Sequence, residues 1–459
     1  MLTPLFKHSS GLLLRENING ERGLKLADAD DGCNNPNGLR NIHFSIGGYK
    51  AEGYPPCIEI RNGQNPEEAT LHTAYFVGAD WLRVGALAAY VEPKLNDDGP
   101  QTDFLQMLSS ALDNPEIAEG LQELYTIDWE APLIALPQKL DLLTPLLVVE
   151  YLQRLRQLTH KGLKKGFYTV TQNLTARLKG KVLTASTIKH NHLKGHALKT
   201  WCSYNEFGMD TEENRLLKRA LRFGSRYLAT RLPDGMPASL SSLVGNLAAA
   251  FEGVSDVADA GQLKAYRNNP FYREYDKATS LARRILSRFG YNIDKTTRPE
   301  DAPTDVPPFW VNMAKLFELH VLALLRKQPG LTVDYQKRFG GDIPDFLLRS
   351  GDQCIIADAK YKRAYEDSKV VEDIRQLSGY ARSERVLDHF GIKAIDGKLL
   401  VLPCWIIYPA ALDTLSASAE PCILNWPSCA SPISGYIDFH KTAVYLPLVR
   451  RKELTQASG

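Results

Sequence analysis

Two aspartates and one lysine lie among apolar residues in the stretch GGDIPDFLLRSGDQCIIADAKYKR, residues 340–363. Asp358 and Lys360 are two positions apart, so on a β-strand their side chains would share one face. Burying carboxylates on apolar strands is unfavourable unless they bind something together, and carboxylate oxygens suit Mg²⁺. This set could perform metal-assisted hydrolysis of a phosphodiester. Asp345 and Asp358 would hold Mg²⁺, and Lys360 would contact the attacking water or the phosphate.

The strands expected to carry these residues form a hairpin. Residues 343–348 and 354–359 are apolar runs, and the Ser-Gly-Asp sequence at 350–352 is typical of a tight turn. Asp345 would then lie in the first strand. A buried Asp–Lys ion pair in an ordinary hairpin would have the same residue types, so the flanking elements must decide between the two interpretations.

Two predicted helices flank the hairpin. Residues 310–326 have an apolar stripe at helical spacing, and Glu318 lies within that apolar setting. Residues 371–382 form the second helix and place Gln376 and Tyr380 four positions apart on one face. We expect Glu318 to be a third metal ligand or a neighbour of the metal. Gln376 and Tyr380 are expected to position the strand or the lysine.

The order helix-Glu, strand-Pro-Asp, strand-Asp-x-Lys and helix-Gln-x-x-x-Tyr resembles the PD-(D/E)xK nuclease superfamily, and the Gln/Tyr spacing is similar to that of its RecB-type members. The resemblance implies a restriction-endonuclease-like α/β nuclease core in the C-terminal part of the chain. Its catalytic residues would be Asp345, Asp358, Lys360 and Glu318. The metal ligands among them would be Asp345, Asp358 and Glu318.

The composition is that of a globular protein with two to three domains, because the chain has 459 residues, 44% of them apolar and 24% charged. No apolar run approaches the roughly 20 residues needed to cross a bilayer, so no membrane partner is expected. The seven cysteines are scattered and include no Cys-x-x-Cys pair. This pattern is typical of a reducing cytoplasm, where we expect the protein, and argues against zinc.

We expect an α+β multidomain chain. Residues 1–130 carry short strand patterns between Asx- and Gly-rich turns, and are predicted to form a strand-rich domain that contacts a partner. Residues 131–291 are predicted to be a basic helical region, and residues 292–308, rich in proline and charge, a linker. Residues 309–459 would be the nuclease domain. The candidate N-terminal strands are 11–15, 42–46, 56–61, 71–77 and 87–92.

The middle region is strongly basic in a chain whose net charge is only +2. Between Arg154 and Arg231 there are 17 lysines and arginines against four acidic residues. Such an asymmetry is expected of a region that contacts a polyanion. We therefore expect DNA contacts from Lys179 and Lys181, and from Lys362 in the nuclease region. Solvated helix faces would give the same charge pattern and remain the alternative.

Several sequence runs, taken together with the Asp-x-Lys motif, resemble the McrC family, the nuclease subunits of the McrBC modification-dependent restriction system. The resemblance covers residues from about 71 to 407 and leaves the first seventy residues and the tail unmatched. The matching runs are Tyr75–Gly78, Val91–Leu95, Gly162, Tyr168, Asn173–Leu174, Lys179–Lys181, Cys202–Phe207, Asn214–Lys218, Met313–Glu318 and Asp358–Lys362.

This resemblance implies a Mg²⁺-dependent endodeoxyribonuclease acting on modified DNA that contains methylcytosine. Its partner would be a McrB-like AAA+ GTPase that recognises the modified site, translocates, and is stimulated by the nuclease. The chain has no G-x-x-x-x-G-K-[ST] phosphate loop, which agrees with this division of labour. Two other interpretations stay open. One is an interaction subunit that activates the GTPase and has secondary nuclease activity; the other is a RecB-like DNA repair nuclease.

Overall fold

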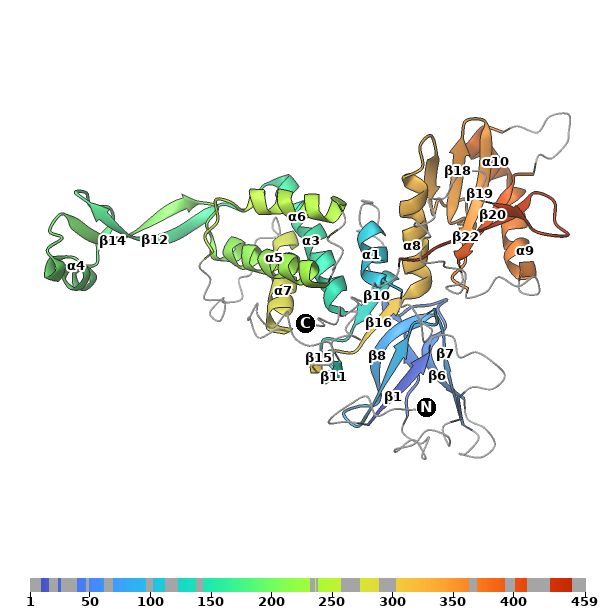
Figure 1. Ribbon diagram of the computed structural model, residues 1–459, viewed down its shortest axis with the longest axis horizontal. Helices are drawn as coiled ribbons and strands as arrows, with labels where there is room; N and C mark the ends of the chain where they lie inside the picture. The colour runs from blue at the N-terminus through green and yellow to red at the C-terminus, as the bar shows by residue number, and fades with distance from the viewer. Residues whose placement is uncertain are drawn as a thin grey trace, which may run out of the picture. The chain divides into compact units, whose positions relative to one another are not determined.

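The computed structural model of the chain divides into two units (Figure 1). The first combines residues 1–146 with residues 299–459, and the second contains residues 147–298. Among the residues that the structure describes, no helix is both long and apolar enough to cross a membrane. The structure describes residues 10–15, 24–25, 39–46, 49–61, 69–95, 102–111, 123–137, 143–231, 236, 238–256, 273–288, 303–362, 370–392, 401–410 and 430–447.

The N-terminal part of the first unit is rich in strands, as predicted. They are β1 (Ser10–Arg15), β2 (Leu24–Lys25), β3 (Ile42–His43), β4 (Ser45–Ile46), β5 (Tyr49–Lys50), β6 (Pro56–Arg61), β7 (Thr70–Thr73), β8 (Phe76–Arg83), β9 (Leu87–Glu92) and β10 (Tyr125–Ile127). One sheet has the order β2-β7-β6-β3. A second has the order β1-β9-β8-β16-β10, where β16 (Phe309–Asn312) comes from much later in the chain. Leu71 and Val91, one from each sheet, lie in the same apolar core.

The expected start of the nuclease domain at residue 309 does not match a structural boundary, because β16 is an inner strand of the N-terminal sheet. Its pairing with β8 is so close that a Cβ at Gly78 would lie 2.0 Å from the Phe309 carbonyl oxygen. The predicted linker is also wrong for residues 303–306, which form β15 (Pro303–Val306) and pair with β11 (Ile134–Pro137). The two strands form a sheet of their own, in which proline is tolerated at a strand end. Residues 292–302 lie outside the described residues.

The C-terminal part of the first unit is a mixed sheet with helices on both sides (Figure 1). Its order is β17-β18-β19-β20-β22-β21, with β19, β20 and β22 parallel to one another. Helix α8 lies on one side, and α9 and α10 lie on the other. The elements are α8 (Met313–Arg326), β17 (Thr332–Tyr335), β18 (Phe346–Ser350), β19 (Gln353–Ala359), α9 (Val370–Ala381), α10 (Glu384–Phe390), β20 (Cys404–Pro409), β21 (Ser431–Pro432) and β22 (Phe439–Val444). The unit also contains α1 (Phe104–Ala111).

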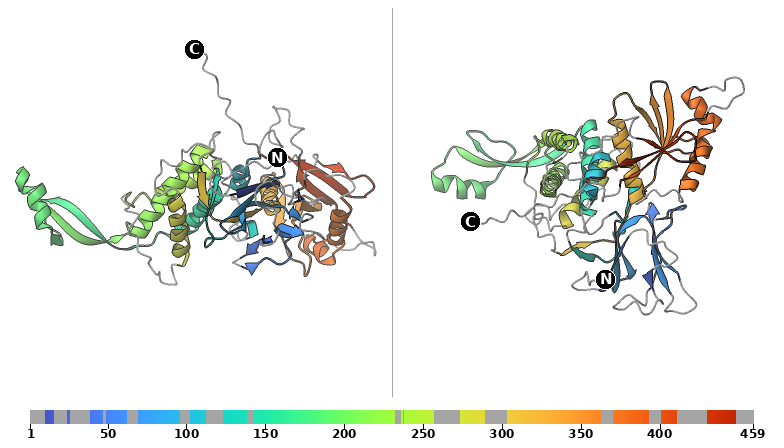
Figure 2. Two further views of the ribbon diagram at one scale, coloured as in Figure 1. Left: turned by 90° about the horizontal axis from the view of Figure 1, so that it is seen from below. Right: turned by 45° about the vertical axis from the view of Figure 1, so that its right-hand side comes forward.

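The second unit consists of helices and one long two-stranded arm (Figures 1 and 2). The helices are α3 (Leu143–Lys161), which begins in the first unit, α5 (Glu212–Arg231), α6 (Ala238–Ala250) and α7 (Arg273–Arg288). The arm, residues 166–208, is made of β12 (Gly166–Thr175) and β14 (Lys199–Gly208), antiparallel over ten residues each. Its tip carries β13 (Lys181–Val182), α4 (Thr184–His190) and the short helix η4 (His192–Lys194). The basic helical region expected here from the sequence did not include the strands of the arm. Most side chains of both arm strands are at least partly exposed, so the sequence lacks the apolar alternation of a half-buried strand.

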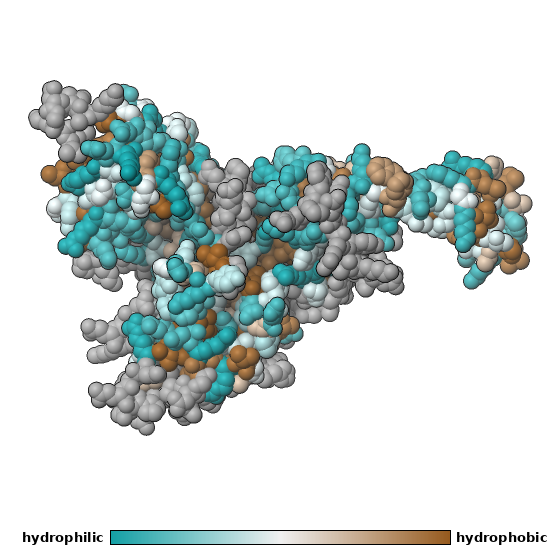
Figure 3. Space-filling model, turned by 180° about the vertical axis from the view of Figure 1, so that it is seen from behind, coloured by the Kyte–Doolittle hydropathy of each residue, from teal (hydrophilic) through white to brown (hydrophobic). Residues whose placement is uncertain are grey.

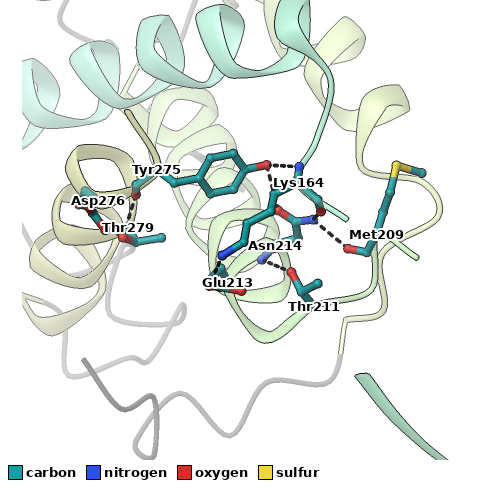
Figure 4. Close-up of polar contacts among 8 residues, drawn as sticks. All are labelled: Lys164, Met209, Thr211, Glu213, Asn214, Tyr275, Asp276 and Thr279. Carbon is teal, nitrogen blue, oxygen red and sulfur yellow. Dashed lines mark hydrogen bonds and ion pairs between the residues drawn. The ribbon is translucent and has the colours of Figure 1, made fainter. Parts of the chain in front are cut away.

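One buried asparagine clamps the root of the arm (Figure 4). The Asn214 side-chain amide, on α5, donates to the carbonyl of Lys164, just before β12, and to that of Met209, just after β14, at 2.9 and 2.7 Å. Its carbonyl oxygen accepts from the hydroxyl of Tyr275 on α7 at 3.1 Å. The same hydroxyl accepts from the Lys164 backbone N–H at 2.6 Å. Both strands of the arm are thus fixed to the helices at one point.

Candidate active site

The β18–β19 hairpin brings the two predicted aspartates together. Antiparallel pairing places Phe346 opposite Ala357, so Asp345, the residue before β18, lies close to the end of β19. The Asp345 Oδ2 atom accepts a hydrogen bond from the Ala359 backbone N–H at 3.0 Å. Asp345 therefore precedes the first strand instead of lying within it, and Lys360 follows the second.

Asp358 is a buried carboxylate that pairs with Lys360. Its side chain is 3% exposed, and its Oδ2 atom lies 2.7 Å from Lys360 Nζ. This contact is a buried ion pair, in which the Lys360 ammonium opposes the charge of the carboxylate. A carboxylate can bind a metal ion through one oxygen while it contacts an ammonium.

The carboxylates of Asp345, Asp358 and Glu318 influence one another. Burial raises the pKa of Asp345 well above its usual range, and the negative charges of Asp358 and Glu318 raise it further. Burial also raises the pKa of Glu318 and of Asp358, whereas the ammonium of Lys360 opposes the shift at Asp358. Negative charges that lie close together in a buried site repel one another, and a bound divalent cation relieves this repulsion.

No three His, Cys, Asp or Glu side chains within the described ranges are arranged to hold a metal ion by themselves. Mg²⁺ does not need such a cage, because it is usually held by one or two carboxylates together with waters and substrate phosphate. Asp345 and Asp358 fit that description. Glu318 lies close enough to raise the pKa of Asp345. It does not form, with the two aspartates, a group of three side chains arranged around a metal ion.

Glu318 is held by a residue that the sequence analysis missed. Gln336 donates its side-chain amide to Glu318 Oε1 at 2.7 Å, and its backbone N–H donates to the Asp345 carbonyl oxygen at 2.9 Å. Its backbone is in the left-handed region, with φ of 45°, which is uncommon for a residue other than glycine. Lys315 lies 3.5 Å from the same Glu318 oxygen. No local pattern in the sequence marks Gln336, because its role depends on a loop conformation.

The predicted helical pair, Gln376 and Tyr380, is connected to Lys360 by hydrogen bonds. Lys360 Nζ donates to Gln376 Oε1 at 3.1 Å, and the Gln376 amide donates to the Tyr380 hydroxyl at 3.1 Å. Both residues lie on α9, whose spacing of four places them on one face. Gln376 contacts the lysine directly, and Tyr380 contacts Gln376.

Asp373, also on α9, was not singled out from the sequence. It is buried and lies 2.6 Å from Lys362 Nζ and 4.0 Å from Lys360 Nζ. Lys362, a predicted DNA contact, thus forms an ion pair within the protein. No local sequence pattern marks this pairing, since Asp373 and Lys362 lie on different elements and meet only in the folded chain.

The other predicted DNA contacts lie on the arm of the second unit. Lys179 Nζ is 2.8 Å from Glu206 and 4.0 Å from the centre of the Tyr204 ring. Hydrogen bonding to Glu206 is the main cause that raises the pKa of Lys179. Lys181, on β13, is exposed. The two lysines therefore differ, because Lys179 has an acidic partner close by and Lys181 lies open to solvent.

Comparisons with known proteins match one family and several chains of solved structures. Residues 90–388 match the family described as McrBC 5-methylcytosine restriction system component. No curated protein matches the chain. A McrB AAA+ hexamer assembly with bound McrC from Thermococcus gammatolerans contains a chain of 16% identity and TM-score 0.37, with 95% of this chain and 94% of that one covered. A chain of the McrBC complex from the same organism has 15% identity and TM-score 0.27, with 69% and 87% covered.

Proposed function

Because this chain belongs to the family of McrBC 5-methylcytosine restriction system components, we propose that it is the component that cuts DNA. The carboxylate–lysine cluster at the end of the β18–β19 hairpin carries this proposal. It joins Asp345, the buried carboxylate of Asp358, and Lys360 on adjacent backbone segments. An ordinary structural ion pair would need neither the second aspartate nor the Gln376–Tyr380 extension behind the lysine.

In this reaction Asp345 and Asp358 would hold Mg²⁺, with Glu318 alongside. The ion, when bound, would make a water more acidic and offset charge on the phosphate. Lys360, 20% exposed, can reach one substrate oxygen with its ammonium while Gln376 keeps the side chain in place. It would orient the attacking water or neutralise the phosphate as the leaving oxygen takes up charge.

The partner of this chain would be an AAA+ GTPase of the McrB kind, and we place the contact on the tip of the arm. Three leucines there are largely exposed: Leu178 by 69%, Leu193 by 77% and Leu198 by 72%. Figure 3 shows apolar residues gathered at the far end of the arm. Exposed apolar groups on an extended, clamped element indicate a protein contact. Partner contact by residues 1–130, expected from the sequence, is compatible with this placement and is a second proposal.

DNA that carries methylcytosine is the proposed substrate, and GTP hydrolysis by the partner is the proposed trigger. The basic second unit would contribute DNA contacts, with Lys181 as an exposed lysine of the arm. GTP hydrolysis would have to come from the partner, because the sequence of this chain has no phosphate loop with which to bind the nucleotide. The interaction-subunit alternative differs in one respect, namely that the carboxylate cluster would be unnecessary to the system.

Cleavage of methylated plasmid by the chain, its cognate GTPase, GTP and Mg²⁺ tests this proposal. Asp358→Ala should abolish cutting yet still stimulate GTP hydrolysis, because it removes a ligand and little core volume. Asp352→Ala is the matched control, since Asp352 is exposed in the turn of the same hairpin. Cutting by Asp358→Ala at the wild-type rate would refute the site. Stimulation of the GTPase by a wild type that never cuts would favour the interaction subunit.

A further inference from the structure

Lys94 is a buried lysine that the proposed chemistry does not use. It lies two residues after β9, at the end of the N-terminal five-stranded sheet, and is 8% exposed. Its ammonium donates to the backbone carbonyl of Tyr361 at 2.7 Å and lies 4.1 Å from the centre of the Tyr361 ring. Two of its contacts are therefore made with one residue, 267 positions away in the chain.

Tyr361 is the residue directly after Lys360. Past the end of β19 the chain has few ladder bonds, and the Lys360 N–H still donates to the Ile407 carbonyl of β20 at 2.8 Å. The Tyr361 carbonyl, one residue on, is held by Lys94 instead of by a strand. The Tyr361 ring lies 5.9 Å from the ring of Phe317, the neighbour of Glu318 on α8. Lys94 thus holds the backbone of Tyr361. This residue lies next to Lys360 in the chain and contacts Phe317 of α8, the helix that carries Glu318.

Burying an ammonium is unfavourable, and an apolar side chain of similar length would fill the same space at lower cost. What the apolar side chain cannot supply is a directed donor to the Tyr361 carbonyl and a cation over the Tyr361 ring. The lysine therefore contributes a charge that an apolar side chain would lack. That charge acts on the backbone at Tyr361, next to Lys360, whose ammonium lies 2.7 Å from Asp358 Oδ2.

We propose that Lys94 is a positioning residue of the nuclease: it ties the N-terminal sheet to the backbone that carries the catalytic lysine. The inference rests on the proposed function, because it assigns Lys94 a part in the same cleavage reaction. The N-terminal sheet then contributes directly to the site, although it supplies no group that touches the substrate. The hydrogen bond between Lys94 and Tyr361 would transmit a shift of this sheet to Lys360.

The test compares Lys94→Met, Lys94→Arg and, as the control, Lys50→Met, because Lys50 is an exposed lysine of the same N-terminal region. Single-turnover cleavage with partner, GTP and Mg²⁺ is measured beside DNA affinity, GTPase stimulation and thermal unfolding. Lys94→Met should slow cleavage at least about tenfold, since small displacements of a reacting group are costly. DNA affinity and GTPase stimulation should stay close to those of the wild type, because Lys94 is a buried residue of the first unit and the substitution leaves the surface unchanged. Lys94→Arg, which keeps a donor, should recover part of the rate.

Hydrogen exchange at the amides of residues 360–362 gives a second measurement that needs no activity. It should be faster in Lys94→Met than in the wild type and unchanged in Lys50→Met. Wild-type cleavage by Lys94→Met, or a loss of cleavage matched by equal losses in DNA affinity, GTPase stimulation and unfolding temperature, would overturn the proposal. A wild type that does not cut at all would instead refute the proposed nuclease function, so the two failures are distinguishable.

Discussion

Gln336 and Glu318 are joined by a 2.7 Å hydrogen bond that connects the loop before the β18–β19 hairpin to helix α8. Because the Gln336 backbone also binds the Asp345 carbonyl oxygen, one residue sets the separation of two carboxylates. Its left-handed backbone is a conformation that most residues adopt at a cost. Such a conformation persists only where surrounding contacts stabilise it, and the two hydrogen bonds of Gln336 are contacts of this kind.

Glu318→Gln should lower the cleavage rate and raise the Mg²⁺ concentration needed for half-maximal cleavage, because it removes a negative charge beside the aspartates. Gln336→Gly should change the Mg²⁺ requirement in the same direction by a smaller factor, since glycine accepts the left-handed backbone and the substitution removes only the side-chain hydrogen bond. Titration of cleavage with Mg²⁺ measures both. Gln353→Ala, at an exposed position on β19, is the control. An unchanged Mg²⁺ requirement in Glu318→Gln would remove Glu318 from the site.

Asp345→Ala, Asp358→Ala and Lys360→Ala should each reduce cleavage by a factor of about 10³ or more, as residues that act as a unit do. Any two of these substitutions combined should reduce it little further. Single-turnover rates of the three single and three double variants decide this. Additive losses in the double variants would mean that the residues act separately, which contradicts a shared metal and lysine.

The sequence predicts the hairpin because the two-residue period of a strand is a local pattern. The same period places Asp358 and Lys360 on one face. The four-residue spacing of a helix face does so for Gln376 and Tyr380. Gln336, Asp373 and Lys94 could not be predicted, since each meets its partner through a loop, a helix from elsewhere, or another sheet. The Lys94–Tyr361 contact spans 267 positions and leaves no trace in either local pattern.

The arm and the shared sheet were missed for a different reason. Strands β12 and β14 have partly exposed residues on both faces, so their sequence shows basic and aromatic residues without apolar alternation. Strand β16 is buried along its whole length and directly precedes helix α8. Its residues, three apolar and one asparagine, therefore could not be distinguished from the helical pattern that follows. In both cases the periodicity that distinguishes a strand was absent.

Lys181→Glu should weaken DNA binding. It should also reduce the slope of log affinity against log salt concentration by about 0.9 for each phosphate that the protein no longer neutralises. Lys179→Glu should have a smaller effect, because the charge of Lys179 is already partly compensated by Glu206 at 2.8 Å. Salt titrations of duplex DNA binding separate the two. Equal, unaltered slopes in both variants would place the tip of the arm away from DNA.

Asn214→Ala should destabilise the second unit, because it leaves the carbonyls of Lys164 and Met209 without their donor. Each buried group left unsatisfied costs about 1–3 kcal/mol. Asn214→Asp should be worse, since a carboxylate would face two carbonyl oxygens. The urea midpoint of unfolding measures both, with Asn246→Ala, at an exposed position on α6, as the control. A wild-type midpoint in Asn214→Ala would show that the arm is anchored by other contacts.

The exposed leucines at the tip of the arm should be needed for activation but not for folding. Leu193→Glu combined with Leu198→Glu alters two side chains that are 77% and 72% exposed, and surface changes of this kind usually shift stability by no more than about 0.5 kcal/mol. The double variant should fail to stimulate GTP hydrolysis by the partner, and therefore fail to cut methylated plasmid. Leu133→Glu, at a leucine of the first unit that is 57% exposed, is the matched control.

Deleting residues 1–130 is a poor alternative test of partner contact, because it would remove β8 and β10, the two neighbours of β16, and so disturb the unit that carries the site. The tip variant leaves that unit intact. If a partner controls the activity as proposed, the isolated wild-type chain should cut little, and addition of GTPase and GTP should switch cutting on. Vigorous cutting without GTP would contradict control by a partner and favour a free-standing repair nuclease. Normal GTPase stimulation by the double variant would instead move the partner contact away from the tip, and toward the strand-rich N-terminal region.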